Sequence, residues 1–175
     1  EYIPKIAFAL VEQSKKIQFG ENVLLWFDPL AIPLVKKIND LCISKGAKVS
    51  LFMRDLEEDA RIIPALDAKG IYDYFNEEEV LVGQADKIIM IRCPKNPLIL
   101  GSVPVDKRDI YFQRYSQVHK RRQRESDSWV IFDWPTEYEA QREKMNYTQY
   151  FQAVMEGCLQ PWERIQKAQA KLKKI

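Results

Sequence analysis

The chain has 175 residues, of which 46% are hydrophobic and 30% are charged, with only six glycines and nine prolines. This length and hydrophobic content are enough to bury a core, which excludes a disordered, collagen-like or low-complexity chain. The longest segment without a charge, residues 145–155, is too short and too polar to span a bilayer. No apolar leader opens the chain, so we expect neither a membrane protein nor an exported one.

Charge is distributed unevenly along the chain. Lys and Arg number 27 against 25 Asp and Glu, a net charge of +2. Residues 164–175 hold five basic side chains and no acid, so residues 1–163 carry 22 against 25, a net charge of −3. The positive balance therefore belongs to the tail, and nucleic acid is not expected as a partner.

Cysteine and histidine usage limits the chemistry. The cysteines Cys42, Cys93 and Cys158 form no CxxC pair, which indicates reduced thiols in a cytoplasmic protein. His119 is the single histidine, and we expect it at the surface or at a helix end. Most hydrolytic metal sites and Ser or Cys triads use at least one imidazole, so a complete hydrolytic site within this chain is not expected.

In the first half of the chain, helical and strand-like patterns alternate. Apolar residues recur at helical spacing before Gly20 and again before Gly46, a residue type that commonly ends helices. Carboxylates at the start of a helix are favoured by the helix dipole. These patterns predict a helix at residues 3–17, a strand at 23–27, a helix at 32–42, a strand at 48–54 and a helix that opens with the acidic segment 55–59.

The second half continues the alternation and then becomes helical. A capping-box-like start at Asn76 opens a short helix, and prolines mark a long irregular loop at residues 94–104. After the last strand we expect helices alone. The predicted elements are a helix from residue 76 to near Gly83, a strand at 87–92, a basic helix at 106–123, a strand at 128–132, and helices that begin near Pro135, Asn146 and Pro161.

Strands separated by helices predict an α/β fold with an open, mainly parallel sheet of about four strands and flanking helices, followed by a helical C-terminal extension. We expect the sheet domain at residues 1–134 and the helical extension at residues 135–175. The last helix carries an apolar stripe and ends with the chain, so we expect the sequence to be part of a longer protein.

Polar residues follow each predicted strand. In open α/β sheets, ligands bind outside the carboxyl ends of the strands. Acids at this edge would be able to hold a divalent cation. However, Asp28 before Pro29 and Asp55 are also typical of helix N-caps, which is the interpretation we prefer. Likewise, Cys93 is read as a small buried hydrophobe in preference to a nucleophile. The candidate cleft consists of Asp28, Asp55, Cys93, Lys95, Asn96 and Asp133.

The basic helix offers a second candidate site. Its cations, with Tyr111, Phe112 and Tyr115 nearby for stacking, would suit an anion or a nucleic acid. The alternative, which we prefer, is a solvated helix face whose aromatic side chains point into the core. The candidate basic surface consists of Arg114, Lys120, Arg121, Arg122 and Arg124.

Several segments, in their order and spacing, resemble the M29 (aminopeptidase T) family of thermophilic, metal-dependent aminopeptidases. The resemblance covers nearly the whole chain, although no single motif is specific. The segments that carry it are Leu10–Ser14, Phe19–Leu24, Pro33–Val35, Lys45–Ala47, Cys93–Leu98, Ser128–Val130, Trp134–Thr136, Glu139–Gln141 and Tyr147–Glu163.

The resemblance implies the N-terminal, non-catalytic domain of a two-domain exopeptidase. In that family a C-terminal domain holds a pair of divalent cations (Zn, Co or Mn) whose bound water attacks the peptide carbonyl. None of those ligand motifs matches a residue here, so we assign no catalytic and no metal-binding residue. The implied partners are the chain's own C-terminal catalytic domain, a second copy and peptide substrates.

Two alternatives stay open. The family resemblance extends to non-haem iron enzymes that open hydroxylated pyridine rings. The other alternative is a stand-alone binding module that uses the basic helix and tail for an acidic partner.

Overall fold

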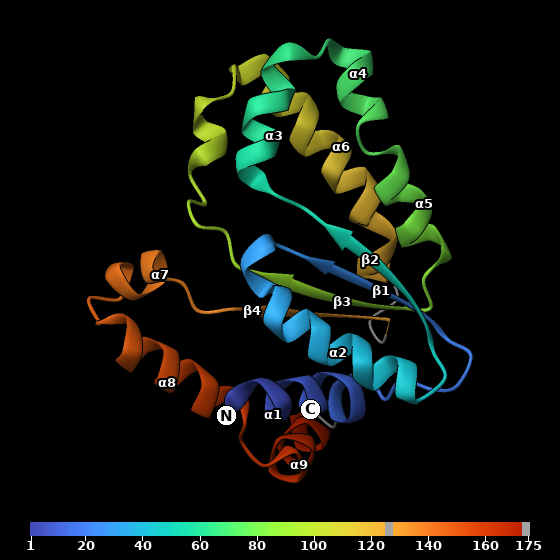
Figure 1. Cartoon of the computed structure of the whole chain (residues 1–175), viewed down its shortest axis with the longest axis vertical. Helices are drawn as coiled ribbons and strands as arrows, with labels where there is room; N and C mark the ends of the chain where they lie inside the picture. The colour runs from blue at the N-terminus through green and yellow to red at the C-terminus, as the bar shows by residue number, and fades with distance from the viewer. Residues whose placement is uncertain (125–127, 173–175) are drawn as a thin grey trace.

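The computed structural model describes residues 1–124 and 128–172, and for residues 121–124 it describes the backbone alone. The chain forms a four-stranded parallel sheet with helices on both faces (Figure 1). The order across the sheet is β2-β1-β3-β4, so β1 and β3 are central. The predicted α/β fold is confirmed. The strands are β1 Asn22–Phe27, β2 Lys48–Met53, β3 Lys87–Arg92 and β4 Trp129–Asp133.

One face of the sheet is covered by the first and last parts of the chain. Side chains alternate between the two faces along a strand. Leu25 and Phe27 of β1 therefore point to this face, where they pack with Leu34 and Ile38 in one buried core. The elements on this face are α1 Tyr2–Phe8, the π-helical turn Ala9–Ser14, the 3-10 turn Pro29–Ala31, α2 Ile32–Ser44 and α8 Tyr147–Cys158.

The other face is covered by the middle of the chain, which lies above the sheet in Figure 1. Leu24 and Ile88 point to this side and pack with Phe75 and Tyr111 in a second core. Because both faces are covered, the central strands have no solvent side, which explains the uninterrupted apolar runs of residues 23–27 and 88–91. The elements here are α3 Leu56–Ile62, the 3-10 turn Ile63–Ala65, α4 Ala68–Asp73, α5 Asn76–Gln84, the 3-10 turn Ile99–Ser102 and α6 Val105–Arg124.

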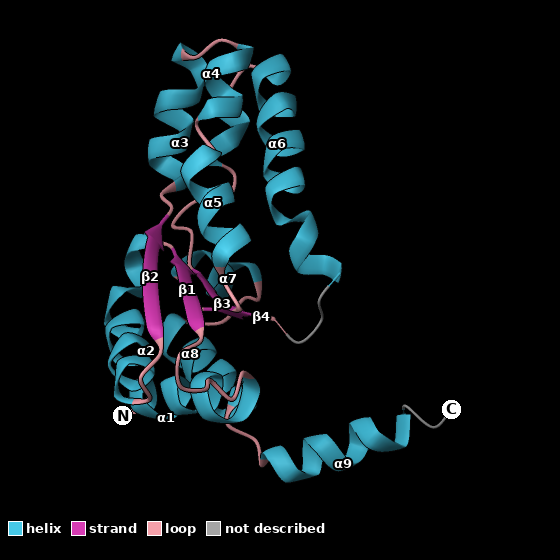
Figure 2. Cartoon of the chain, turned by 90° about the vertical axis from the view of Figure 1, so that its right-hand side faces the viewer, coloured by secondary structure: helices cyan, strands magenta, loops and turns pink. Residues whose placement is uncertain are grey.

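After β4 the chain continues through α7 Glu137–Arg142, α8 and α9 Trp162–Leu172. The start of α7 is a capping box, in which the Thr136 hydroxyl accepts from the Glu139 N–H and the Glu139 carboxylate accepts from the Thr136 N–H. Met155 of α8 is completely buried in the first core. By contrast, α9 has no buried residue and extends away from the other elements (Figure 2). The helices after residue 134 thus share the sheet's core through α8.

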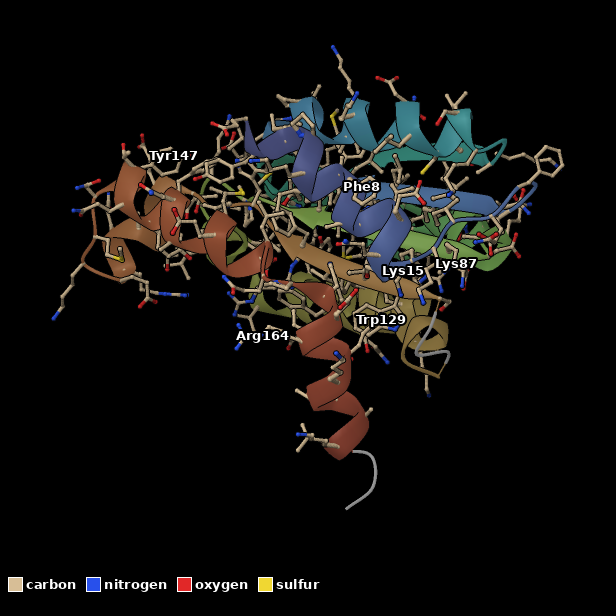
Figure 3. All side chains as sticks on the ribbon, turned by 90° about the horizontal axis from the view of Figure 1, so that it is seen from below. Phe8, Lys15, Lys87, Trp129, Tyr147 and Arg164 are labelled. Atoms are coloured by element: carbon tan, nitrogen blue, oxygen red, sulfur yellow. The ribbon has the colours of Figure 1, made fainter. Side chains whose placement is uncertain are left out.

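A long-range contact ties the N-terminal helix to the edge of the sheet. Lys15 follows the π-helical turn, and its Nζ donates to the carbonyl of Trp129 in β4 at 2.8 Å. Figure 3, a view from below, shows the two residues near each other, with Phe8 on the same N-terminal segment as Lys15. This contact joins segments that are 114 residues apart.

The structure departs from the sequence prediction in the helices. The first predicted helix changes at Ala9 into a π-helical turn and is followed by Lys16 at φ +51°, although Ile17 stays buried as predicted. The helix α4 was not predicted. Its N-cap is Asp67, whose carboxylate accepts from the Gly70 N–H.

Capping at α5 is also different from the prediction. Asn76 is the first residue of α5 and not its N-cap, and the N-cap Phe75 makes no side-chain cap hydrogen bond. Phe75 instead puts its ring into the second core, where it is completely buried. In the part of the chain that the structure describes, no helix is long and apolar enough to cross a membrane.

We expect Met155→Ala to lower the free energy of unfolding by about 2–5 kcal/mol, because it leaves a cavity between α8 and the sheet. Leu172→Ala is the control, since this α9 side chain is 70% exposed, and it should change stability by no more than about 0.5 kcal/mol. Urea unfolding followed by circular dichroism measures both. Equal stabilities of the two variants would show that α8 does not share the sheet's core.

Candidate functional site

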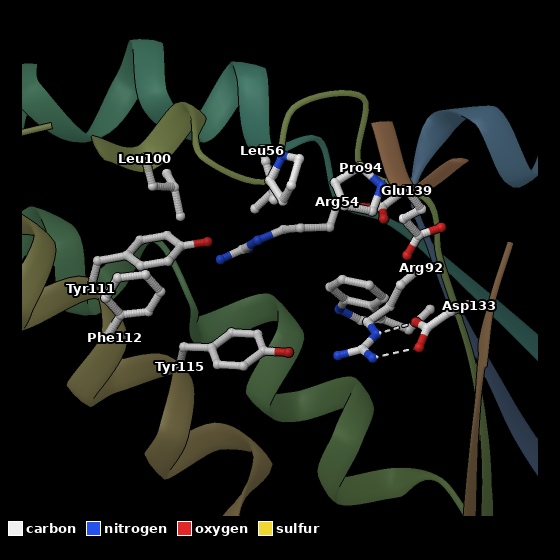
Figure 4. Close-up of a pocket in the computed structure, with 13 residues that line it drawn as sticks. Arg54, Leu56, Arg92, Pro94, Leu100, Tyr111, Phe112, Tyr115, Asp133 and Glu139 are labelled. Atoms are coloured by element: carbon white, nitrogen blue, oxygen red, sulfur yellow. Dashed lines mark hydrogen bonds and ion pairs between the residues drawn. The ribbon is translucent and has the colours of Figure 1, made fainter. Parts of the chain in front are cut away.

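A cleft with a volume of about 350 Å³ opens above the carboxyl ends of the strands (Figure 4). Its floor comes from the strand ends and its walls come from α6, the start of α3 and the loop after β3. This is the edge at which open α/β sheets bind ligands. The residues that line the cleft are Trp26, Asp28, Arg54, Leu56, Arg92, Pro94, Pro97, Leu100, Tyr111, Phe112, Tyr115, Asp133 and Glu139.

The aromatic wall of the cleft comes mainly from α6. Tyr115 comes four residues after Tyr111 and three after Phe112, so it neighbours both of them on the helix surface, and all three line the cleft. Tyr111 is buried, whereas Phe112 is about half exposed at 49%. Figure 4 shows Tyr111 directed toward the guanidinium group of Arg54 and Tyr115 directed toward that of Arg92, with the Phe112 ring beside Tyr111.

Arg54 is the centre of a buried ion network behind this wall. It follows β2 directly, its backbone N–H donates to the Phe27 carbonyl, and it is only 4% exposed. Its Nε lies 3.0 Å from the carboxylate of Asp59, and its Nη1 lies 3.1 Å from the carboxylate of Glu78. The guanidinium carbon also lies 4.3 Å from the centre of the Phe75 ring. Two carboxylates therefore compensate one buried cation.

Both carboxylates of the network have further partners. Asp59 accepts hydrogen bonds from the hydroxyls of Tyr74 and Tyr111, each at 2.6 Å. Glu78 accepts one from the Trp26 indole at 2.7 Å, and its Oε1 lies 2.7 Å from His119 Nε2.

The pKa of Glu78 reports the strength of these contacts. Burial raises the pKa of this carboxyl, but His119, Arg54 and Trp26 together outweigh burial and hold the pKa below its usual value. Glu78 therefore stays ionised across the neutral range. The network joins β1, β2, α3, α5 and α6, so it fixes the position of the aromatic wall relative to the sheet.

Asp28 is a third buried carboxylate, and it lies outside this network. It is 4% exposed and lines the cleft. Its Oδ2 accepts from the backbone N–H of Cys93 at 2.6 Å. Burial raises the pKa of Asp28 to about 6, against the opposing effect of the Cys93 N–H, and the nearby Asp55 raises it further. As predicted, Asp28 is the N-cap of the turn that begins at Pro29, but its side chain makes no capping hydrogen bond and bonds instead to the neighbouring strand end.

The structure gathers five of the six predicted cleft residues around a narrow pocket next to the main cleft. This pocket has room for only about 20 Å³, the scale of a single water molecule. In the described residues no group of three His, Cys, Asp or Glu side chains is arranged to hold a metal ion. The five residues are Asp28, Asp55, Cys93, Lys95 and Asn96.

The members of this pocket have structural partners. As predicted, Asp55 is the N-cap of α3 and accepts from the Glu57 N–H. Cys93 is buried, as predicted for a small hydrophobe, and burial raises the pKa of its thiol to about 12. Lys95 Nζ lies 3.9 Å from the carboxylate of Glu57, and the Asn96 side chain accepts from the Leu98 N–H.

The sixth predicted residue, Asp133, lies in the main cleft instead. It forms a two-point ion pair with Arg92 of the adjacent strand, with oxygen–nitrogen distances of 2.6 and 2.8 Å. Figure 4 shows this pair at the end of the cleft opposite Tyr111. The sequence placed Arg54 at a strand end but outside the candidate cleft, and Arg92 and Trp26 were not predicted as cleft residues. The available signal was a charged residue at or directly after the end of an apolar strand.

The predicted basic surface is wrong for Arg114. This side chain is largely buried and donates to both carboxylate oxygens of Glu79, at 3.1 and 2.6 Å. The expected surface position of His119 is also wrong, because this side chain is buried against Glu78. Lys120 is exposed. The side chains of Arg121, Arg122 and Arg124 lie outside the described residues.

The geometry thus defines an α/β domain with an aromatic cleft over the carboxyl edge of its sheet. A scan against protein-family models finds no match, and neither does a search of curated proteins.

Among solved structures, the chain is similar to wild-type AmpT from Thermus thermophilus, with a TM-score of 0.65 and 14% identity over 88% of this chain. The chain spans 42% of the length of AmpT. This likeness shows a shared fold. An alcohol dehydrogenase superfamily protein from Novosphingobium aromaticivorans also matches, with 16% identity over 98% of this chain and 49% of that protein. Its TM-score of 0.36 is too low to carry an argument.

We expect Glu78→Gln to lower the free energy of unfolding by about 3–5 kcal/mol, because it removes the anion that Arg54 and His119 share. Glu77→Gln is a matched control one residue away, on the exposed side of α5, and should cost no more than about 0.5 kcal/mol. Urea unfolding at neutral pH measures both. If the two variants have the same stability, the network does not hold the cleft together.

Asp28 should make stability depend on pH. Its pKa in the folded chain is about 6, above the ordinary 3.8, so the folded state binds the proton more tightly. Its contribution is present at acidic pH and is lost as the pH rises through about 6. Relative to Asp28→Asn, the wild-type chain should therefore lose up to about 3 kcal/mol of unfolding free energy between about pH 4 and pH 7.

Urea unfolding of both chains at the two pH values checks this difference, and carboxyl ¹³C NMR locates the titration of Asp28. A parallel change in both chains would contradict the raised pKa.

Proposed function

We propose that the chain is the N-terminal, non-catalytic domain of a metal-dependent aminopeptidase, an enzyme that removes N-terminal residues from peptides. The observation that carries the proposal is the likeness to AmpT, an aminopeptidase T, over 88% of this chain but only 42% of AmpT. A domain that corresponds to less than half of a peptidase fits a parent protein with a second domain of comparable size.

In this proposal the second domain holds the catalytic metals, a pair of Zn, Co or Mn ions. The chain itself shapes and roofs the active-site cavity, which restricts access to short peptides. The helix α9 supports this arrangement, because it projects from the sheet domain and none of its apolar residues is buried, from Trp162 and Ile165 to Leu172. These residues recur at helical spacing, and such an apolar stripe is suited to a contact with a following domain.

The proposal also includes a homodimer in the cytoplasm. The edge strand β2 supports a contact with a second copy, because Leu51 and Met53 are each more than half exposed on it. Exposed apolar edge strands favour association with another chain.

The two alternatives have less support. A binding module for an acidic partner would need a free basic face on α6, but Arg114 is paired with Glu79. The ring-opening dioxygenase alternative differs only in the metal that the second domain would hold, and no contact among the residues that the structure describes favours it.

The test compares this chain with the protein encoded by its complete reading frame, each assayed on leucine p-nitroanilide with added Co²⁺, Zn²⁺ or Mn²⁺. The longer protein should release p-nitroaniline in a metal-dependent manner, and residues 1–175 alone should not exceed the rate of the free metal ions. Metal-dependent turnover by the 175 residues would contradict the proposal. So would a reading frame that stops at Ile175, or a longer protein without peptidase activity.

A further inference from the structure

Within the described part of the chain, the cleft has carboxylates without an ion-pair partner, whereas both of its guanidinium groups are paired. Three carboxylates and two guanidinium groups line it. Arg54 is compensated from behind by Asp59 and Glu78, and Arg92 is compensated by Asp133 within the cleft. The remaining carboxylates, Asp28 and Glu139, form no ion pair with any described residue.

Asp28 is the more confined of these two carboxylates. Its side chain is nine-tenths buried, yet it lines both the main cleft and the adjoining narrow pocket. One oxygen, Oδ2, accepts from the Cys93 N–H. A buried carboxylate normally has a cationic partner, because a buried charge without compensation is costly. Among the residues described, no cation lies within ion-pair distance of Asp28, and Arg92, which is paired with Asp133, acts on it only from farther away.

The rest of the cleft lining is mostly apolar and aromatic. Trp26, Phe112 and Tyr115 present ring surfaces, and Leu100 and Pro97 extend the apolar lining. The faces of aromatic rings carry negative electrostatic potential and attract cations. The volume of about 350 Å³ is at the lower end of the range for small-molecule pockets.

We propose that the cleft binds a small organic cation, an amine joined to an apolar or aromatic body, with its ammonium group at Asp28 and its body against the rings of Trp26, Phe112 and Tyr115. An anion of the same size would meet two uncompensated carboxylates and two guanidinium groups that already have partners. A free amine and the amino terminus of a peptide with an apolar first residue present the same chemistry. This assignment goes beyond the proposed function and does not depend on it, because it concerns the cleft alone.

The test uses three probes of nearly equal size that differ in charge: 2-phenylethylamine, 2-phenylethanol and 3-phenylpropionate. Each is titrated into the full 175-residue chain at neutral pH, and binding is followed by calorimetry and by NMR. The amine should bind with a Kd at least tenfold lower than the Kd of the alcohol or the carboxylate. A parallel titration with L-phenylalanine amide shows which of the two amine sources binds more tightly.

Variants locate the binding. Asp28→Asn keeps an acceptor for the Cys93 N–H and should weaken amine binding at least tenfold. Asp40→Asn removes the same charge from the exposed side of α2, on the other face of the sheet, and should leave the affinity unchanged. Phe112→Ala changes a half-exposed side chain and should weaken binding severalfold, so it tests the site even if Asp28→Asn does not fold.

Tighter binding of the carboxylate than of the amine would overturn the proposal. The same holds for an amine affinity that neither Asp28→Asn nor Phe112→Ala changes, and for the absence of amine binding at millimolar concentrations.

Discussion

The buried ion pairs of Arg54 are the interaction that positions the helices above the sheet in Figure 1. Arg54 lies directly after β2, and its two anionic partners come from α3 and α5. A cation without solvent can be kept in place only if anions and hydrogen bonds compensate it, so these helices are bound to one position above the sheet. The helix α6 is joined to the same network, because the Tyr111 hydroxyl donates to Asp59 and the His119 imidazole contacts Glu78.

The cleft is a consequence of this arrangement. Apolar packing is tolerant of small shifts, whereas a network of ion pairs requires specific distances. The helix α6 contributes Tyr111 and His119 to the network and also carries the aromatic wall. The network therefore sets the distance between the wall and the strand ends. The ion pair of Arg92 with Asp133 then closes one end of the cleft between β3 and β4. Polar contacts thus shape a cavity whose lining is largely aromatic.

The fold was predictable from sequence to the extent that local patterns decide it. Strand β1 was recognisable because a strand covered on both faces must be apolar throughout. The burial of His119 was not recognisable, since its neighbours in sequence are basic and its partner Glu78 is 41 residues away. The side chain of Asp28 could cap the turn that follows it, but it accepts a hydrogen bond from the distant backbone N–H of Cys93 instead. The local sequence pattern does not show which of two such donors a side chain will bond to.

The candidate site was also predictable only where local sequence patterns decide the structure. The strand-end positions were identified correctly as an edge, because parallel strands end together. Sequence alone did not distinguish the narrow pocket beside Cys93 from the wider cleft beside Tyr111, since the difference depends on how far α6 stands from the sheet. That distance is set by contacts between residues far apart in the chain, such as those of Tyr111 with Asp59 and of His119 with Glu78.

The single helix α6 also limits which insertions and deletions the protein can accept. Between Tyr111, which bonds Asp59, and His119, which contacts Glu78, the helix has a fixed number of residues. One added or removed residue in this stretch would rotate everything beyond it by about 100°. The imidazole would then leave Glu78 while the phenol stayed in place. Variation in chain length is therefore confined to the connections outside this stretch, such as the loop between β3 and α6.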